Sequence, residues 1–107
     1  MASNSKLYLI VREDLSPAQQ AVQAAHALRQ WVEECPEQDQ LWFNTSNCLA
    51  LVTVPNEREI KILYERALIR GIPTSMFREP DRGNEVTSIV IAPTGRNICK
   101  HLPLALK

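Results

Sequence analysis

The sequence contains no long apolar run, no excess of charge of one sign and no glycine-rich tract. No apolar segment approaches the roughly 18 residues that a membrane-spanning helix needs, and the opening residues MASNSK lack the apolar core of a secretory signal. The formal net charge of +0 at pH 7 argues against a general nucleic-acid binder. We therefore expect a cytoplasmic protein, with no membrane partner, that folds as a single domain over residues 1–107.

Ligands for a metal or a phosphate group are also not arranged in any familiar pattern. The cysteines Cys35, Cys48 and Cys99 form no C-x-x-C pair, which excludes the usual zinc and disulfide spacings and predicts reduced, packed thiols. The histidines His26 and His101 stand far apart and away from any cysteine pair. There is neither a glycine-rich phosphate loop nor a G-x-S-x-G elbow. We expect no metal and no cofactor.

The first third of the chain predicts a strand followed by a helix. The apolar run 7–11 is typical of a buried strand. The segment SPAQ (16–19) is a strong helix start, because Ser16 can cap, proline suits the first helical position and the glutamine completes a capping box. This helix is expected to run to about Glu33, with one apolar face. The residues expected on that face are Ala18, Ala21, Val22, Ala25, Leu28 and Val32.

Residues 34–47 are polar and contain Pro36, so we expect a loop there. Trp42 and Phe43 in this segment are either an anchor into the domain's own core or a contact in a homodimer. The sequence alone leaves these two interpretations open.

The remaining elements complete an α/β pattern. We expect strands at 48–54, 73–77 and 86–92, a helix from an Asn56 cap to Gly71, and a short helix at 94–101. The order β-α-β-α-β-β-α favours a three-layer sandwich with a mixed four-stranded sheet, in which the last two strands form a hairpin.

Ligands in such folds usually sit outside the carboxyl ends of the parallel strands. The amino-terminal part of the first helix is therefore the expected place for a site. His26 lies there beside the apolar face, and helical spacing puts Gln19, Gln23 and Gln30 on its side. His26 is either a half-exposed histidine hydrogen-bonded to a glutamine, or a general base or ligand-orienting group.

Other candidates near this end also have two interpretations. Arg12 and Asp14 leave the first strand, either as a surface ion pair or as ligand groups. Asp81 is either a turn aspartate or, with Glu79, part of a carboxylate pair that orients a water or a histidine. Thr87 opens an apolar strand, where a β-branched residue is ordinary. Three arginines are either solvated surface charges or phosphate contacts: Arg78, Arg82 and Arg96.

These blocks together resemble the type 2 peptidyl-tRNA hydrolase family. YLIVREDL followed by QAAHA is similar to the family's opening R-x-D-L and Q-x-x-H-A blocks. EPDRGNEVTSIVIAP is similar to the closing block, which runs from an acidic turn into a strand that carries a threonine. The intervening strand, capped helix, glycine and strand match in order, so the resemblance covers nearly the whole chain.

The resemblance implies a metal-independent hydrolase that cleaves the ester between a peptidyl group and the 3′ ribose of tRNA. Arg12, Asp14, Gln23 and His26 match the first block. The family's acidic and threonine site positions match Asp81, or alternatively Glu79, and Thr87. His26 would then activate water, and the carboxylate would orient the water or the imidazole. Thr87 and Gln23 would hold the ester carbonyl or the terminal adenosine, and tRNA would be the partner.

The chain departs from the family's pattern at the start of the first helix. The family's glycines and lysine are replaced by the shorter SPAQQAV, so that Gln19 or Gln20 takes the vacated place. The acidic turn is also shorter and lacks the family's T-Q pair. A lost cation near a developing oxyanion weakens catalysis. The alternative is therefore a catalytically weakened module that binds tRNA or a protein, and a small-ligand regulatory domain is a weaker third possibility.

Overall fold

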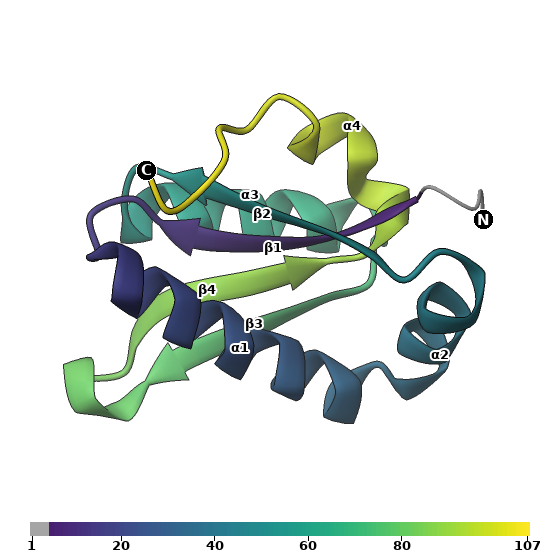
Figure 1. Ribbon diagram of the computed structural model, residues 1–107, viewed down its shortest axis with the longest axis horizontal. Coiled ribbons are helices and arrows are strands. Elements are labelled where there is room, and N and C mark those ends of the chain that lie inside the picture. The colour runs from purple at the N-terminus through teal and green to yellow at the C-terminus, as the bar shows by residue number, and fades with distance from the viewer. Residues whose placement is uncertain (1–4) are drawn as a thin grey trace.

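A computed structural model describes residues 5–107 as a four-stranded mixed sheet with helices on both faces (Figure 1). The strands are β1 Lys6–Arg12, β2 Cys48–Val54, β3 Thr74–Glu79 and β4 Glu85–Ile91. Their order across the sheet is β2-β1-β4-β3. Strands β1 and β2 are parallel, whereas β4 is antiparallel to both β1 and β3. The first three strands therefore run in one direction, and the predicted α/β fold with a mixed sheet is confirmed.

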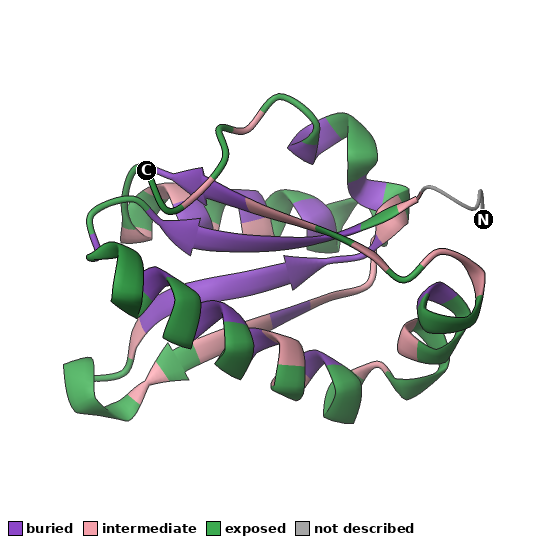
Figure 2. Cartoon of the chain, viewed as in Figure 1, coloured by how far each residue is buried: buried purple, intermediate pink, exposed green. Residues whose placement is uncertain are grey.

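Within residues 5–107, four helices and two short turns of 3₁₀ helix connect or follow the strands. The helices are α1 Pro17–Glu34, α2 Pro36–Thr45, α3 Glu57–Ile69 and α4 Arg96–Cys99, and the turns are η1 Pro80–Arg82 and η2 Pro93–Gly95. Two separate apolar clusters hold the layers together. One joins α1 and α2 to one face of the sheet, and the other joins α3 and α4 to the opposite face. Figure 2 shows the buried sheet between partly exposed helices.

Capping residues in the sequence correctly predict where α1 and α3 begin and where α3 ends. The Ser16 hydroxyl accepts the Gln19 N–H at 3.2 Å, and the Asn56 side chain accepts the Glu59 N–H at 3.0 Å. Gly71 adopts a positive φ of 68° just after α3, as expected for the residue that ends a helix. The last helix is shorter than predicted, and β3 runs on to Glu79.

The prediction of a loop over 34–47 is wrong, because residues 36–45 form α2. Pro36 occupies the first turn, where its missing N–H has no helical partner to lose, so it starts the helix instead of excluding one. Trp42 is 4 % exposed and donates its indole N–H to the Cys48 carbonyl at 2.8 Å. It is thus an anchor into the domain's own core, whereas Phe43 is exposed.

The predicted apolar face of α1 is also wrong. Of the six residues expected there, five are exposed and only Leu28 is partly buried. The helix instead turns Gln20, Gln23, Ala24, Ala27 and Trp31 toward the sheet. Glutamines can be buried where both ends of the amide are bonded, and the Gln20 side chain bonds the main chain of Leu15 and Leu106.

Residues 103–105 run beside β2, which is an edge strand of the sheet (Figure 1). The Thr53 N–H donates to the Pro103 carbonyl at 2.9 Å, and the Ala105 N–H donates to the Leu51 carbonyl at 3.0 Å. An isolated antiparallel bridge pairs Val52 with Leu104 between these bonds. The segment therefore covers much of the free edge of β2.

Candidate functional site

The carboxyl ends of β1, β2 and β3 lie at the end of the sheet where α1 begins, on the left of Figure 1. Arg12 ends β1, Glu79 ends β3, and Glu85 begins the antiparallel β4 at the same end. The turn η1 connects the last two of these residues. Polar side chains from four elements thus gather where α/β folds place their ligands.

Gln23 is the centre of a hydrogen-bonded network that links α1 to β3 and β4. The side chain is only 1 % exposed. Its amide nitrogen donates to the Glu79 carboxylate at 2.9 Å and to the Gln19 side-chain oxygen at 3.3 Å. Its amide oxygen accepts the hydroxyl of Thr87 at 2.7 Å. Since an ionised carboxylate only accepts, the orientation of the Gln23 amide follows from its partners.

A β-bulge brings two successive hydroxyls of β4 to the same side of the sheet. Phe77 pairs with Ser88 and Arg78 pairs with Val86, which leaves Thr87 as the extra residue. The Ser88 hydroxyl donates to the Gln23 carbonyl at 2.6 Å, while Thr87 reaches the side chain of the same residue. Bulges commonly re-aim side chains next to functional sites, and this one gives Thr87 its inward direction.

His26 lies one helical turn after Gln23 and is exposed. Its ring stacks on Phe77 of β3, with ring centroids 4.7 Å apart and planes 9° from parallel. No hydrogen bond within residues 5–107 joins His26 to a glutamine, so that interpretation of the polar strip is wrong. The stacking on Phe77 fixes the plane of the imidazole, and the ring nitrogens lie at the edge of the two stacked rings.

The two candidate carboxylates have different surroundings. Glu79 is partly buried and bonded to Gln23. Asp81 lies on η1 and is exposed, and in the described part of the chain no hydrogen bond joins it to His26 or Thr87. Of the two residues, Glu79 is therefore the one that the structure connects to Gln23 and Thr87.

Arg12 is buried at the end of β1, with 6 % of its surface exposed. Its Nε and Nη2 atoms donate to the two carboxylate oxygens of Asp14, both at 2.9 Å. Its Nη1 atom donates to Glu85 at 2.7 Å and to the Val86 carbonyl at 3.3 Å. The bidentate pair with Arg12 holds the pKa of Asp14 below its usual value. With its three nitrogens engaged, this guanidinium ties β1 to the start of β4.

The three other arginines do not lie together. Arg78 donates to the Asn84 carbonyl at 3.2 Å, and Arg82, the last residue of η1, approaches Glu85 at 3.7 Å, so both lie at this turn. Arg96 begins α4, which follows the opposite end of β4. Arg96 therefore lies apart from Arg78 and Arg82, and the interpretation of all three as phosphate contacts remains a prediction.

Sequence reasoning missed Glu57 and Phe77. The carboxylate of Glu57, in the first turn of α3, accepts the Val86 N–H at 2.8 Å, and this bond holds the pKa of Glu57 below its usual value. An acidic residue directly after the Asn56 cap was the available signal for Glu57. The sequence contains no signal for the role of Phe77, because its contact with His26 depends on how α1 lies across β3.

The described residues contain neither a candidate membrane span nor a cluster of metal ligands. No helix within residues 5–107 is long and apolar enough to cross a membrane. No three histidine, cysteine, aspartate or glutamate side chains in that range lie together as ligands for a metal ion.

Comparisons with known proteins agree with one another. A family model described as "Peptidyl-tRNA hydrolase PTH2" matches residues 5–107. A protein named peptidyl-tRNA hydrolase from Thermococcus onnurineus (strain NA1) is 35 % identical over 80 residues, which cover 69 % of this chain and 68 % of that protein. A solved structure of a protein of unknown function from Agrobacterium tumefaciens strain C58 shares the fold, with a TM-score of 0.64 and 20 % identity over 92 % of this chain and 96 % of that one.

Proposed function

The chain belongs to the peptidyl-tRNA hydrolase PTH2 family, and from that membership we propose that it hydrolyses the ester bond of peptidyl-tRNA. The match over residues 5–107 is the observation that carries the proposal. The reaction adds water across the ester, which releases the peptide as a carboxylate and leaves the 3′ hydroxyl on the tRNA. No step of it calls for a metal or a cofactor.

We assign the activation of water to His26. An imidazole is the commonest general base in proteins, and this one is exposed near the carboxyl ends of the strands. Its stack on Phe77 keeps the ring in one plane, so a nitrogen lone pair can point to one place. Preorganisation of this kind lowers the entropic cost of reaching the reactive geometry.

The network around Gln23 supplies the groups that position the ester. Gln19 and Glu79 are its partly accessible members, and they are placed to contact the substrate carbonyl or the terminal adenosine. Thr87 is fully buried and donates to Gln23, so its role is to position the amide. Asp81 remains the second candidate for the carboxylate that orients the water.

The arginines have two distinct roles in this proposal. Arg78, close to η1, and Arg82, on η1, are exposed and are suited to contact tRNA phosphates. Arg12 acts as a positioning residue, because Asp14, Glu85 and the Val86 carbonyl already engage its three nitrogens.

The decisive assay measures release of peptide from purified peptidyl-tRNA. We expect His26→Ala to lower the single-turnover rate by about 10²–10⁴-fold, as for loss of a general base. His101→Ala is the matched control, since this exposed histidine follows α4 and lies against α3, on the face of the sheet opposite to α1, and it should retain the full rate. A wild-type protein no faster than its His26→Ala and Asp81→Ala variants would overturn the proposal.

The same assay separates the two carboxylates. Glu79→Gln is expected to lower the rate more than Asp81→Asn, because only Glu79 is bonded to Gln23. Glu65→Gln, on the exposed side of α3, is the control for loss of one negative charge. A larger effect of Asp81→Asn would transfer the role to the residue on η1.

The catalytically weakened binding module remains the alternative outcome. The start of α1 contains no lysine, which is the observation that favours it. Binding of tRNA that weakens steeply with salt, without release of peptide, would support this module over the hydrolase.

A cytoplasmic location and a homodimer are further expectations. Phe43 is 55 % exposed on α2 and is the residue we expect in a dimer contact. Sedimentation velocity of the wild type and of Phe43→Ser tests this, since a monomer in both would exclude the dimer.

A further inference from the structure

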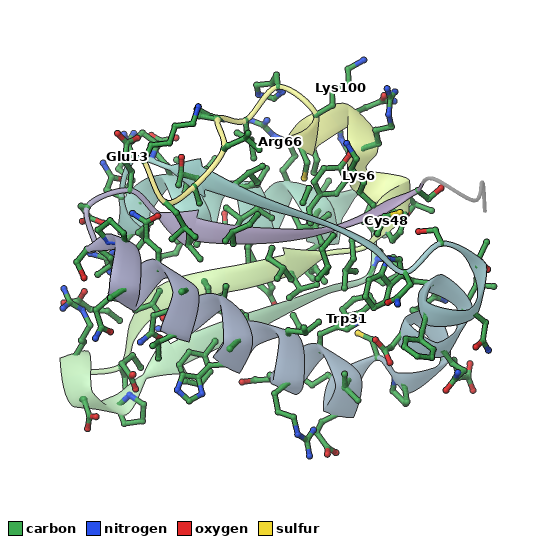
Figure 3. All side chains as sticks on the ribbon, viewed as in Figure 1. Lys6, Glu13, Trp31, Cys48, Arg66 and Lys100 are labelled. Carbon is green, nitrogen blue, oxygen red and sulfur yellow. The ribbon has the colours of Figure 1, made fainter. Side chains whose placement is uncertain are left out.

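A cavity of about 520 Å³ lies at the other end of the sheet from the proposed hydrolase site. It is bordered by the start of β1, the middle of β2, α4 and the segment after α4. In Figure 3 the labelled Lys6 and Lys100 lie beside α4, while Glu13 lies at the opposite end of β1. The cavity therefore does not overlap the network around Gln23.

The charged residues that line this cavity are all cationic. They are Lys6, Arg96 and Lys100, and no aspartate or glutamate is among the lining residues. Within residues 5–107, none of the three forms a salt bridge. Unpaired charges of one sign around a concave surface attract and hold an anion.

Tyr8 supplies a polar group in the wall of the same cavity. The residue is 5 % exposed, and its hydroxyl has no hydrogen-bond partner in the described part of the chain. No fully enclosed side-chain nitrogen or oxygen of residues 5–107 lacks a partner, so the Tyr8 oxygen must reach the open cavity. Burial raises the pKa of Tyr8, and the phenol therefore remains a neutral donor near neutral pH. This hydroxyl can therefore donate to an acceptor in the cavity.

Apart from Ser5, the rest of the wall is apolar. Ala50 and Val52 come from β2, and Leu102 and Leu104 come from the segment after α4. The cavity thus combines an anion-attracting rim with a surface against which a flat ring can pack. Its volume falls in the range of small-molecule sites, which is about 300–1,000 Å³.

We propose that this cavity binds a small phosphorylated ligand of the mononucleotide class. The phosphate would lie among Arg96, Lys6 and Lys100, where the guanidinium offers a bidentate contact. The base or sugar would pack on the apolar wall, with the Tyr8 hydroxyl donating to an oxygen of the ligand. This assignment does not depend on the hydrolase activity, because no residue of the cavity belongs to the other site.

Isothermal titration of the full chain with AMP, CMP, GMP and UMP tests the proposal, with inorganic phosphate and adenosine as separate probes. We expect at least one mononucleotide to bind more tightly than phosphate or adenosine alone. Arg96→Gln should weaken that binding about tenfold or more, as expected for loss of a charge-assisted contact. Arg58→Gln, an exposed arginine on α3 outside the cavity, is the matched control and should bind as the wild type does.

Amide chemical shifts of the same titration locate the ligand. Shifts should concentrate at Lys6, Arg96 and Lys100, and Tyr8→Phe should reduce affinity several-fold while leaving the thermal unfolding midpoint nearly unchanged. The absence of binding by every mononucleotide at millimolar concentration would overturn the proposal. Shifts confined to α1 and η1 would do the same, since the nucleotide would then occupy the hydrolase site.

Discussion

Replacing Gln23 by leucine is expected to destabilise the protein mainly through the hydroxyl that it leaves behind. Leucine nearly conserves the volume of the side chain, so no large cavity forms. Thr87, which is fully buried, loses the only acceptor that its hydroxyl has in the described chain. An unsatisfied buried hydroxyl costs about 1–3 kcal/mol. Loss of the bond to the partly exposed Glu79 adds about 1 kcal/mol.

The expected loss of unfolding free energy for Gln23→Leu is therefore about 2–4 kcal/mol. Urea unfolding at equilibrium measures it, and with an m-value of about 1–2 kcal/mol per molar the midpoint should fall by about 2 M. The added substitution Thr87→Val removes the unsatisfied hydroxyl. The double variant should therefore recover about 1–3 kcal/mol relative to Gln23→Leu.

Gln30→Leu is the matched control on the same helix. Its amide bonds only Glu34 at the exposed side of α1, so its unfolding free energy should change by less than about 0.5 kcal/mol. A double variant no more stable than Gln23→Leu would refute the reasoning. It would mean that the desolvated hydroxyl of Thr87 is not the main cost.

Three other predictions concern charge, packing and thiol reactivity. Arg12→Met should cost about 1–3 kcal/mol at neutral pH, since the carboxylates of its pairs are partly exposed. Because the pKa of Asp14 is lowered in the folded state, this stabilisation is present above the ordinary pKa of the carboxyl group and is lost as pH falls through the lowered value. In urea unfolding, the unfolding free energies of the wild type and of Arg12→Met should therefore converge in acid. Gly95→Ala places a Cβ against a methyl group of Ile91 and should lower the unfolding free energy, measured in urea, by about 1–3 kcal/mol. Gly83→Asn, at an uncrowded position with left-handed backbone, should leave the unfolding free energy nearly unchanged. Burial raises the pKa of Cys99 to about 12, so a disulfide reagent at mildly alkaline pH should modify this thiol far more slowly than Cys35 and Cys48. Cys99→Ser should remove the slow phase of the reaction. Equally fast modification of all three thiols would contradict the burial of Cys99.

Local chemistry in the sequence is enough to predict the fold. The caps at Ser16 and Asn56 and the glycine after α3 depend on neighbours within a few residues, and the structure confirms them. The parallel pairing of β1 with β2 and the hairpin of β3 with β4 follow from the alternation of helices and strands and from short connections, whereas the place of β4 between β1 and β3 does not. These signals fail for α2, because a proline within a polar segment favours a loop, whereas Pro36 occupies the first turn of a helix.

The inner face of α1 could not be predicted from its own residues. Burial of Gln20 and Gln23 is favourable only because partners far along the chain satisfy their amides. Counting apolar residues on the helix therefore selected the wrong face. The position of Thr87 is non-local for a similar reason, since the bulge that directs it exists only through the pairing of β4 with β3.

The segment 103–105 beside β2 has a consequence for how the protein behaves in solution. A free edge strand presents unpaired main-chain groups on which another chain can add, and this is a common start of aggregation. The Thr53 N–H and the Leu51 carbonyl bond this segment and so occupy part of that edge. A proteolytic cut after Leu102 lies outside the helices and outside the proposed hydrolase site, yet it would convert β2 into a template for association between molecules.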